Sequence, residues 1–86
     1  MSRYYFDLHD GVDIIDEDGL ELASLESARH HAVMKMAELL MQAPGQFWAG
    51  DAWTLKVKDD LGLTLFRLNF SATEAAVVAA PKSAVG

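Results

Sequence analysis

The chain of 86 residues contains no cysteine, only two prolines and no long uninterrupted run of apolar residues. The absence of cysteine excludes disulfides, thiolate metal ligands and a cysteine nucleophile. A membrane-spanning helix needs about 18 or more consecutive apolar residues, and no stretch of this sequence reaches that length. The first residues enter an alternating pattern without a basic leader or an apolar stretch, so we expect no export signal, no membrane partner and a cytoplasmic location.

Basic residues are also scarce, since seven Lys and Arg stand against thirteen Asp and Glu and give a net charge of -6. The imbalance lies in residues 1–26, which hold eight acidic residues against Arg3 alone, a net charge of -7. An acidic surface repels phosphate backbones at long range, so the composition disfavours nucleic-acid binding. The only residues that could form a basic patch are Lys56, Lys58 and Arg67.

Hydrophobic residues make up 51% of the chain, which excludes a disordered protein, and the length suffices for one small core. We therefore expect a single domain over residues 1–70, followed by an Ala- and Val-rich tail over residues 71–86. In the tail, Ser71-x-x-Glu74 forms a capping box and predicts a short helix to about Ala80, before Pro81.

The longest periodic segment runs from Ser24 to Gly45 and predicts one long helix. Ser24 fits the N-cap position, and Pro44-Gly45 ends the helix where the pattern ends. A turn of about 100° per residue brings eight apolar residues into one arc, which we expect to face the core. The arc contains Leu25, Ala28, Ala32, Val33, Met36, Leu39, Leu40 and Ala43. His31 and Lys35 fall on the strip expected to face solvent.

Two pairs of alternating segments flank this helix. Residues 3–9 place Tyr4, Phe6 and Leu8 on one side, and Asp10-Gly11 makes a tight turn into a second strand. That strand covers residues 12–15, and residues 20–22 form a short extended piece before the helix. After a linker over residues 46–52, residues 53–58 and 63–70 alternate around a turn at residues 59–62. The pattern predicts an α+β fold of order ββαββ, in which two antiparallel hairpins form, most simply, one four-stranded antiparallel sheet with the long helix on one face.

Several short motifs carry a resemblance to a known family. They are Arg3-Tyr4-Tyr5-Phe6-Asp7, Asp10-Gly11, Asp16-x-Asp18-Gly19-x-Glu21-Leu22 and Ala28-Arg29-x-x-Ala32. With these motifs the chain resembles the DUF6894 family of short alphaproteobacterial proteins of unknown function, best over residues 2–43. The resemblance implies a cytosolic protein with two hairpins flanking a helix, and it carries over no catalytic residue.

No group of residues has the spacing of a metal site. Asp13, Asp16 and Asp18-Gly19 suggest a calcium loop, but Gly19 at the sixth position would put Ile14 first and Leu25 twelfth, where carboxylates are needed. His30 and His31 point in different directions on the helix and His9 lies on a strand, so a shared zinc ion is not expected. The spacing also shows no triad and no carboxylate pair. We therefore expect no catalytic residue, no metal, no cofactor and no enzymatic activity.

Arg29 is the one charged residue inside the arc expected to face the core. The structural interpretation is that its stem lies along apolar surface while its guanidinium pairs with Asp16, Asp18 or Glu21 and ties the first hairpin to the helix. The functional interpretation is an arginine that binds the anion of a ligand or a partner carboxylate.

The helix has more apolar surface than one sheet can cover, because Met34, Ala37 and Met41 extend that surface to the far side. We therefore expect a non-catalytic protein-interaction module that self-associates, as a homodimer, through these three residues. The alternative for the helix is that the tail folds back and covers it in a monomer. The alternative function is a regulator that binds a small ligand or nucleic acid on the open sheet face. Trp53 is expected in the core, and the sequence leaves the role of Trp48 open.

Overall fold

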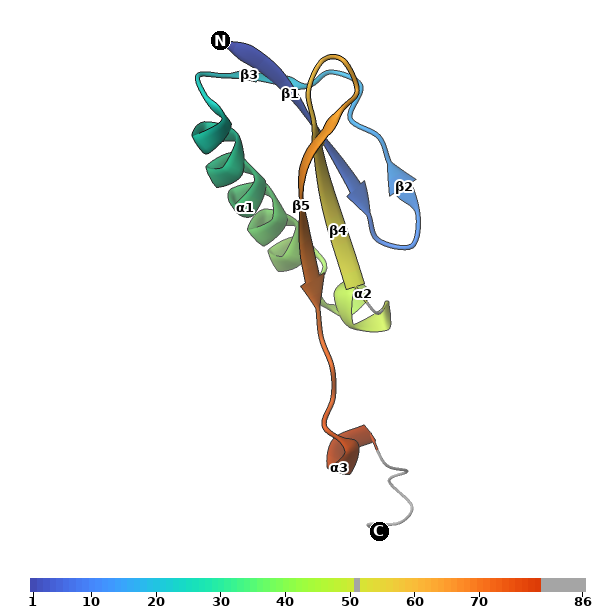
Figure 1. Ribbon diagram of the computed structural model, residues 1–86. Helices are drawn as coiled ribbons and strands as arrows, with labels where there is room; N and C mark the ends of the chain where they lie inside the picture. The colour runs from blue at the N-terminus through green and yellow to red at the C-terminus, as the bar shows by residue number, and fades with distance from the viewer. Residues whose placement is uncertain (51, 80–86) are drawn as a thin grey trace.

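The computed structural model describes residues 1–50 and 52–79 and shows an antiparallel sheet with one long helix on one face (Figure 1). In chain order the elements are β1 (Ser2–His9), β2 (Asp13–Ile14), β3 (Leu20–Leu22), α1 (Leu25–Gln42), α2 (Pro44–Ala49), β4 (Ala52–Lys58), β5 (Thr64–Ser71) and α3 (Ala76–Ala79). The expected α+β class and the two hairpins around one long helix are thus confirmed. No helix in the described part of the chain is long and apolar enough to cross a membrane.

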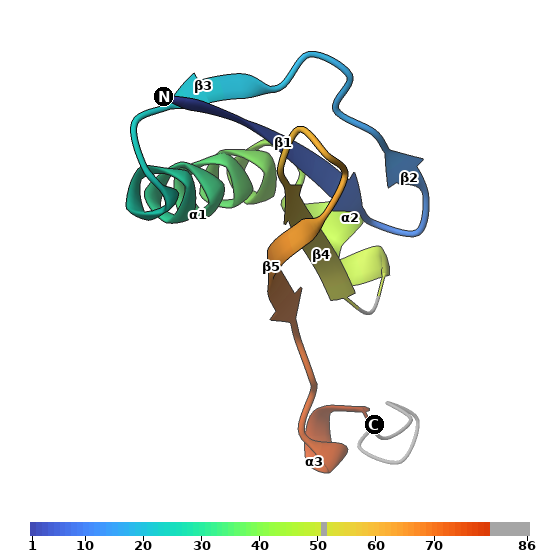
Figure 2. The same cartoon turned by 45° about the horizontal axis from the view of Figure 1, so that its top comes forward.

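The sheet has five strands rather than four, in the order β2-β1-β4-β5, with β3 as a further partner of β1. Both β2 and β3 lie along the outer edge of β1, where β3 pairs with its first half and β2 with its second half (Figure 2). Residues 15–19 form the loop between them. The extended piece before the helix is therefore a strand in its own right, and the acidic loop interrupts the outer edge.

The alternation of the strands is confirmed by which side chains they bury. Tyr4, Phe6 and Leu8 of β1 meet Trp53, Leu55 and Val57 of β4 in the core. The corresponding side chains of β5 are only half-buried, because β5 is the last strand on its side: Phe66, Leu68 and Phe70. The core thus lies between α1 and the two central strands.

The helix α1 begins at the expected cap, where the Ser24 hydroxyl accepts a hydrogen bond from the Ser27 N–H at 3.1 Å. Its fully buried residues are Ala28, Ala32 and Met36, but Val33 is 52% exposed. His31 and Lys35, expected in solvent, are half-buried instead. The helix is therefore turned about its axis relative to the sequence expectation. Its small alanines let it approach β1, and the His31 ring meets the Phe6 ring edge-on, with 4.8 Å between the ring centroids.

The segment after α1 differs from the expected linker, because Pro44 opens a second short helix, α2. Proline fits the first turn of a helix, where its missing N–H would have no partner. α2 places the Phe47 ring edge-on against Trp53 at 5.6 Å, and Trp53 is buried as expected. Trp48, on the same helix, is 61% exposed.

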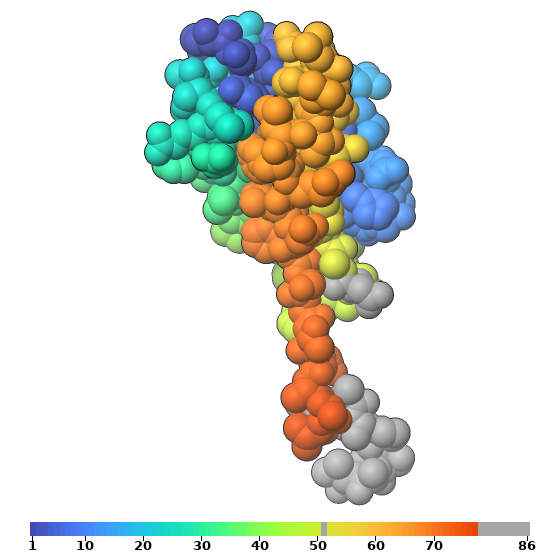
Figure 3. All heavy atoms as spheres, viewed as in Figure 1, coloured from blue at the N-terminus to red at the C-terminus, as the bar shows by residue number. Residues whose placement is uncertain are grey.

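The tail also differs from the expectation, since Ser71 ends β5 and α3 covers only Ala76–Ala79. Figures 1 and 3 show α3 beyond the end of β5, away from α1. The predicted end of the tail helix at about Ala80, before Pro81, lies outside the described residues.

Candidate functional site

The face of the sheet opposite α1 carries polar side chains in two rows. The register places Arg67 of β5 beside Lys56 of β4, and Lys56 beside Asp7 of β1. In the next row Asn69, Thr54, His9 and Asp13 follow one another across four strands. We call this surface the open face.

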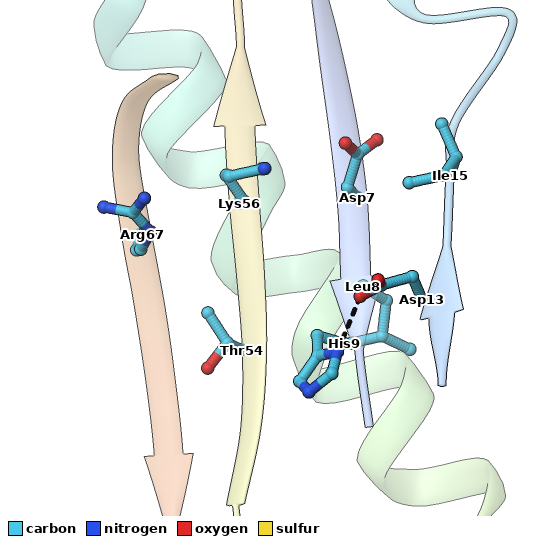
Figure 4. Close-up of a pocket in the computed structure, with 8 residues that line it drawn as sticks. All are labelled: Asp7, Leu8, His9, Asp13, Ile15, Thr54, Lys56 and Arg67. Carbon is cyan, nitrogen blue, oxygen red and sulfur yellow. Dashed lines mark hydrogen bonds and ion pairs between the residues drawn. The ribbon is translucent and has the colours of Figure 1, made fainter. Parts of the chain in front are cut away.

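The open face contains a hollow of about 270 Å³ over β1, β2 and β4 (Figure 4). Lys56 and Arg67 stand on one side of this hollow, and Asp7 and Asp13 stand on the other. The remaining residues that line it are Leu8, His9, Ile15 and Thr54. One rim is therefore cationic and the other acidic.

Asp7 is the one buried charged residue of the described chain, with 5% of its surface exposed. Its Oδ2 forms an ion pair with Lys58, whose Nζ lies 2.6 Å away. Its Oδ1 accepts a hydrogen bond from the Asp16 N–H at 3.0 Å. Burying a carboxylate is costly unless it is paired. Both oxygens of Asp7 are therefore used within the fold.

Asp16 organises the acidic loop through its carboxylate. Its Oδ2 accepts the Phe6 N–H of β1 at 3.1 Å, and its Oδ1 accepts the Asp18 and Gly19 N–H groups at 3.2 and 3.0 Å. Partial burial raises the pKa of Asp16, but these three backbone bonds and the nearby Lys35 outweigh that effect and hold the pKa below its usual range. The side chain thus fills the gap between β2 and β3 on the edge of β1.

Arg3, rather than Arg29, contacts the acidic segment. Its guanidinium donates to the Asp18 carbonyl oxygen at 2.7 Å and to Oε1 of Glu21 at 3.2 Å. Arg29 is exposed because of the turn of α1, and it makes no ion pair within the part of the chain that the structure describes. The structure therefore brings Glu21 to Arg3 and leaves Arg29 apart from Asp16, Asp18 and Glu21.

The three histidines lie apart. His9 places Nδ1 at 2.6 Å from Oδ1 of Asp13 on the open face, whereas His31 meets the Phe6 ring edge-on and His30 is exposed. Among the described residues no three potential ligands from His, Asp or Glu gather where they could hold a metal ion.

The three residues expected at an interface share the outer side of α1. Met34 is 69% exposed, Met41 is 82% exposed, and Ala37 between them is also exposed. We call them the outer stripe. It lies on the far side of the molecule from the open face, so the two candidate surfaces are separate.

Sequence reasoning missed the central role of Asp16 and the burial of Asp7. The signal for Asp16 was present, because Asp followed two and three residues later by Asp-Gly is typical of a side chain that bonds the backbone of its own turn. Nothing in the alternation of β1 distinguishes Asp7 from the half-buried Arg3 and the exposed His9 on the same face.

Comparisons with known proteins identify a family but no activity. No curated protein and no solved structure matches the sequence. Residues 3–71, which span the five strands apart from the first residue of β1, together with α1 and α2, match the family described as Domain of unknown function (DUF6894). The chain therefore belongs to the DUF6894 family.

Proposed function

We propose that this protein is a non-catalytic interaction module that self-associates as a homodimer through the outer stripe of α1. The observation that carries the proposal is the exposure of Met34 and Met41 on a helix whose opposite face is already covered by the sheet. Burying a methionine side chain contributes about 1.5 to 3 kcal/mol, so the two side chains in each copy give a substantial incentive for association.

The outer stripe is compatible with a two-fold symmetric contact. Met34, Ala37 and Met41 are spaced by three and four residues, which is the spacing of helices that pack side by side. When two copies of α1 run antiparallel, Met34 of one copy meets Met41 of the other. The small side chain of Ala37 lies near the centre, where the two helix backbones can approach closely.

The described part of the tail, residues 71–79, lies away from this surface, since α3 lies beyond the end of β5 (Figure 1). We therefore expect the full chain and a variant ending at Ser71 to associate to the same degree. If the full chain were a monomer and the shortened chain a dimer, the tail would cover the outer stripe and the proposed role of this surface would be wrong.

Sedimentation velocity over a wide concentration range tests the proposal directly. We expect a concentration-dependent dimer that Met34→Glu and Met41→Glu each convert to a folded monomer. Leu61→Glu is the matched control, because Leu61 is an equally exposed apolar residue in the β4–β5 turn. A monomeric wild type, or equal loss of dimer in the control, would contradict the proposed interface.

The hollow of the open face favours a second candidate function, a regulator that binds a ligand there. Lys56 and Arg67 place positive charge at a concave surface. Small anionic ligands and nucleic acids both need such charge in order to bind. Binding to nucleic acid should weaken steeply as the salt concentration rises, whereas association through the outer stripe should not.

A further inference from the structure

Lys56 and Arg67 form a pair of like charges on the open face. They are cross-strand neighbours in the β4–β5 register. Like charges directly opposite each other destabilise a sheet. Neither side chain has an ion pair or a hydrogen bond to another described residue. This pair is therefore a place where the fold holds uncompensated positive charge.

The nearest acidic group is already paired within the fold. Asp7 is the register neighbour of Lys56 on β1, but its two oxygens already contact Lys58 and the Asp16 N–H. Asp13, on the far rim of the hollow, contacts His9 at 2.6 Å. In Figure 4 the Lys56 ammonium points toward Asp7 and the Arg67 guanidinium lies over β5, so both positive groups line the hollow, and neither forms an ion pair with another described residue.

We propose that the hollow is a binding site for a small oxyanion, a carboxylate or a phosphate group, held between Nζ of Lys56 and the guanidinium of Arg67. A guanidinium presents two parallel N–H donors that match the two oxygens of either group, and an ammonium adds a point charge. The bound anion removes the repulsion between the two cations. Thr54, the next residue of β4 on this face, lines the hollow beside Lys56.

The surroundings select a small ligand over a polyanion. The volume of about 270 Å³ is slightly below the usual range of pockets for drug-sized ligands, which suits a molecule of a few non-hydrogen atoms. The net charge of -6 and the exposed Asp13 on the far rim disfavour an extended phosphate backbone, which would have to pass these charges, whereas a small anion needs to contact only Lys56 and Arg67. This inference develops the second candidate function and is independent of the dimer, because the outer stripe lies on the opposite side.

The test is a ¹⁵N NMR titration of the full chain with inorganic phosphate and, separately, with succinate. Sodium chloride keeps the ionic strength constant. We expect saturable shifts centred on Thr54, Lys56 and Arg67. Lys56→Gln and Arg67→Gln should each weaken binding about tenfold, as expected for the loss of one charge-assisted contact. Arg29→Gln is the matched control, since it removes one exposed positive charge from α1 and should leave the affinity unchanged.

Thermal melting supplies a second measurement. Without added anion, Lys56→Gln should melt at a slightly higher temperature than the wild type, because the like-charge pair is gone. Saturating anion should raise the melting temperature of the wild type and not that of the variant. Saturation by phosphate or by succinate supports the site, and the tighter of the two identifies the class of ligand.

Three results would overturn the inference. These are shifts that grow linearly without saturation, equal weakening in Arg29→Gln, and tight duplex DNA binding that phosphate does not displace. A dimer-breaking Met34→Glu variant should still bind the anion, so failure of the self-association proposal and failure of the anion site can be told apart.

Discussion

The two sides of the sheet are held together in different ways. On one side, β4 and β5 pair through seven residue pairs, of which six are consecutive and the seventh follows a bulge at Val57 and Lys58. On the other, β1 has only two pairs with β2 and three with β3, and the gap between them is closed by the carboxylate of Asp16. A long regular ladder distributes its stability over many equivalent bonds. The other edge, formed by β2, the acidic loop over residues 15–19 and β3, is the acidic edge. Its stability depends on a few side chains, so single substitutions there should have much larger effects.

The largest expected effect is that of Gly19→Ala in the acidic loop. Gly19 has a φ of +69°, and an added Cβ would lie 2.8 Å from Cε2 of Tyr5 and 3.0 Å from the carbonyl oxygen of Tyr4. Left-handed strain of about 1 kcal/mol then adds to overpacking of about 1 to 3 kcal/mol. We expect a loss of about 3 kcal/mol in the free energy of unfolding, measured by urea denaturation.

Gly62 in the β4–β5 turn provides the control, since its φ is +84° and an added Cβ meets nothing within 4 Å. Gly62→Ala should cost only the backbone strain, about 1 kcal/mol. Equal losses at the two glycines would show that the close approach of Gly19 to β1 adds nothing.

Asp16→Ala should follow, with a loss of about 2 to 3 kcal/mol, because it leaves the part-buried Phe6 N–H without its acceptor and frees two N–H groups of the loop. Asp59 is the counterpart in the other hairpin, where its Oδ1 accepts the Leu61 and Leu63 N–H groups at 2.9 Å. These bonds are exposed, so Asp59→Ala should cost about 1 kcal/mol. Urea denaturation of both variants measures the difference, and a larger loss in Asp59→Ala would reverse the comparison.

Acid should weaken the same edge first. The folded state lowers the pKa of Asp16 below its ordinary value of 3.8, so the unfolded chain takes up the proton more readily. This contribution to stability is complete above the ordinary pKa and is lost as the pH falls through 3.8 toward the folded pKa. Hydrogen exchange in residues 16–22 should accelerate in acid before exchange in β4 does. In Asp16→Asn this part of the pH dependence should be absent, and an unchanged pH profile would argue against the role of Asp16.

The smallest effect is expected between β1 and β3, where Arg3 makes an exposed ion pair with Glu21. Such pairs contribute about 1 kcal/mol or less. Arg3→Gln should therefore lower stability slightly and speed hydrogen exchange at Asp18 and Glu21. Arg29→Gln should change neither quantity. A larger effect at Arg29 than at Arg3 would instead support the ion pair of Arg29 that the sequence predicted.

Periodicity was sufficient to predict the class of fold, the long helix and the inward row of every main strand. It could not predict the rotation of α1, because the hydrophobic arc alone ranks Leu25, Val33 and Met36 as equivalent. The contact of His31 with Phe6 and the short side chains of Ala28 and Ala32 determine which flank approaches β1. That rotation exposes Arg29, so its expected ion pair failed to appear for a tertiary reason.

The two candidate surfaces differ in how far the sequence could lead to them. The outer stripe was readable from helix spacing, because Met34, Ala37 and Met41 lie far enough from the apolar arc to stay exposed despite the rotation of α1. The hollow on the open face depends on the register between β1, β4 and β5, which sets Lys56 beside both Asp7 and Arg67. Sequence reasoning named Lys56 and Arg67 as basic residues but had no means of placing them opposite each other.

The unequal edges of the sheet also bear on aggregation. An exposed strand edge is a template on which other chains can add. On the β1 side the acidic loop interrupts this template with negative charge, whereas β5 shows an uninterrupted outer edge in the described structure. A sheet that accepts a new strand on one edge only can join a second molecule but cannot grow in both directions. We therefore expect the acidic loop to hinder the addition of a further strand at the β1 edge.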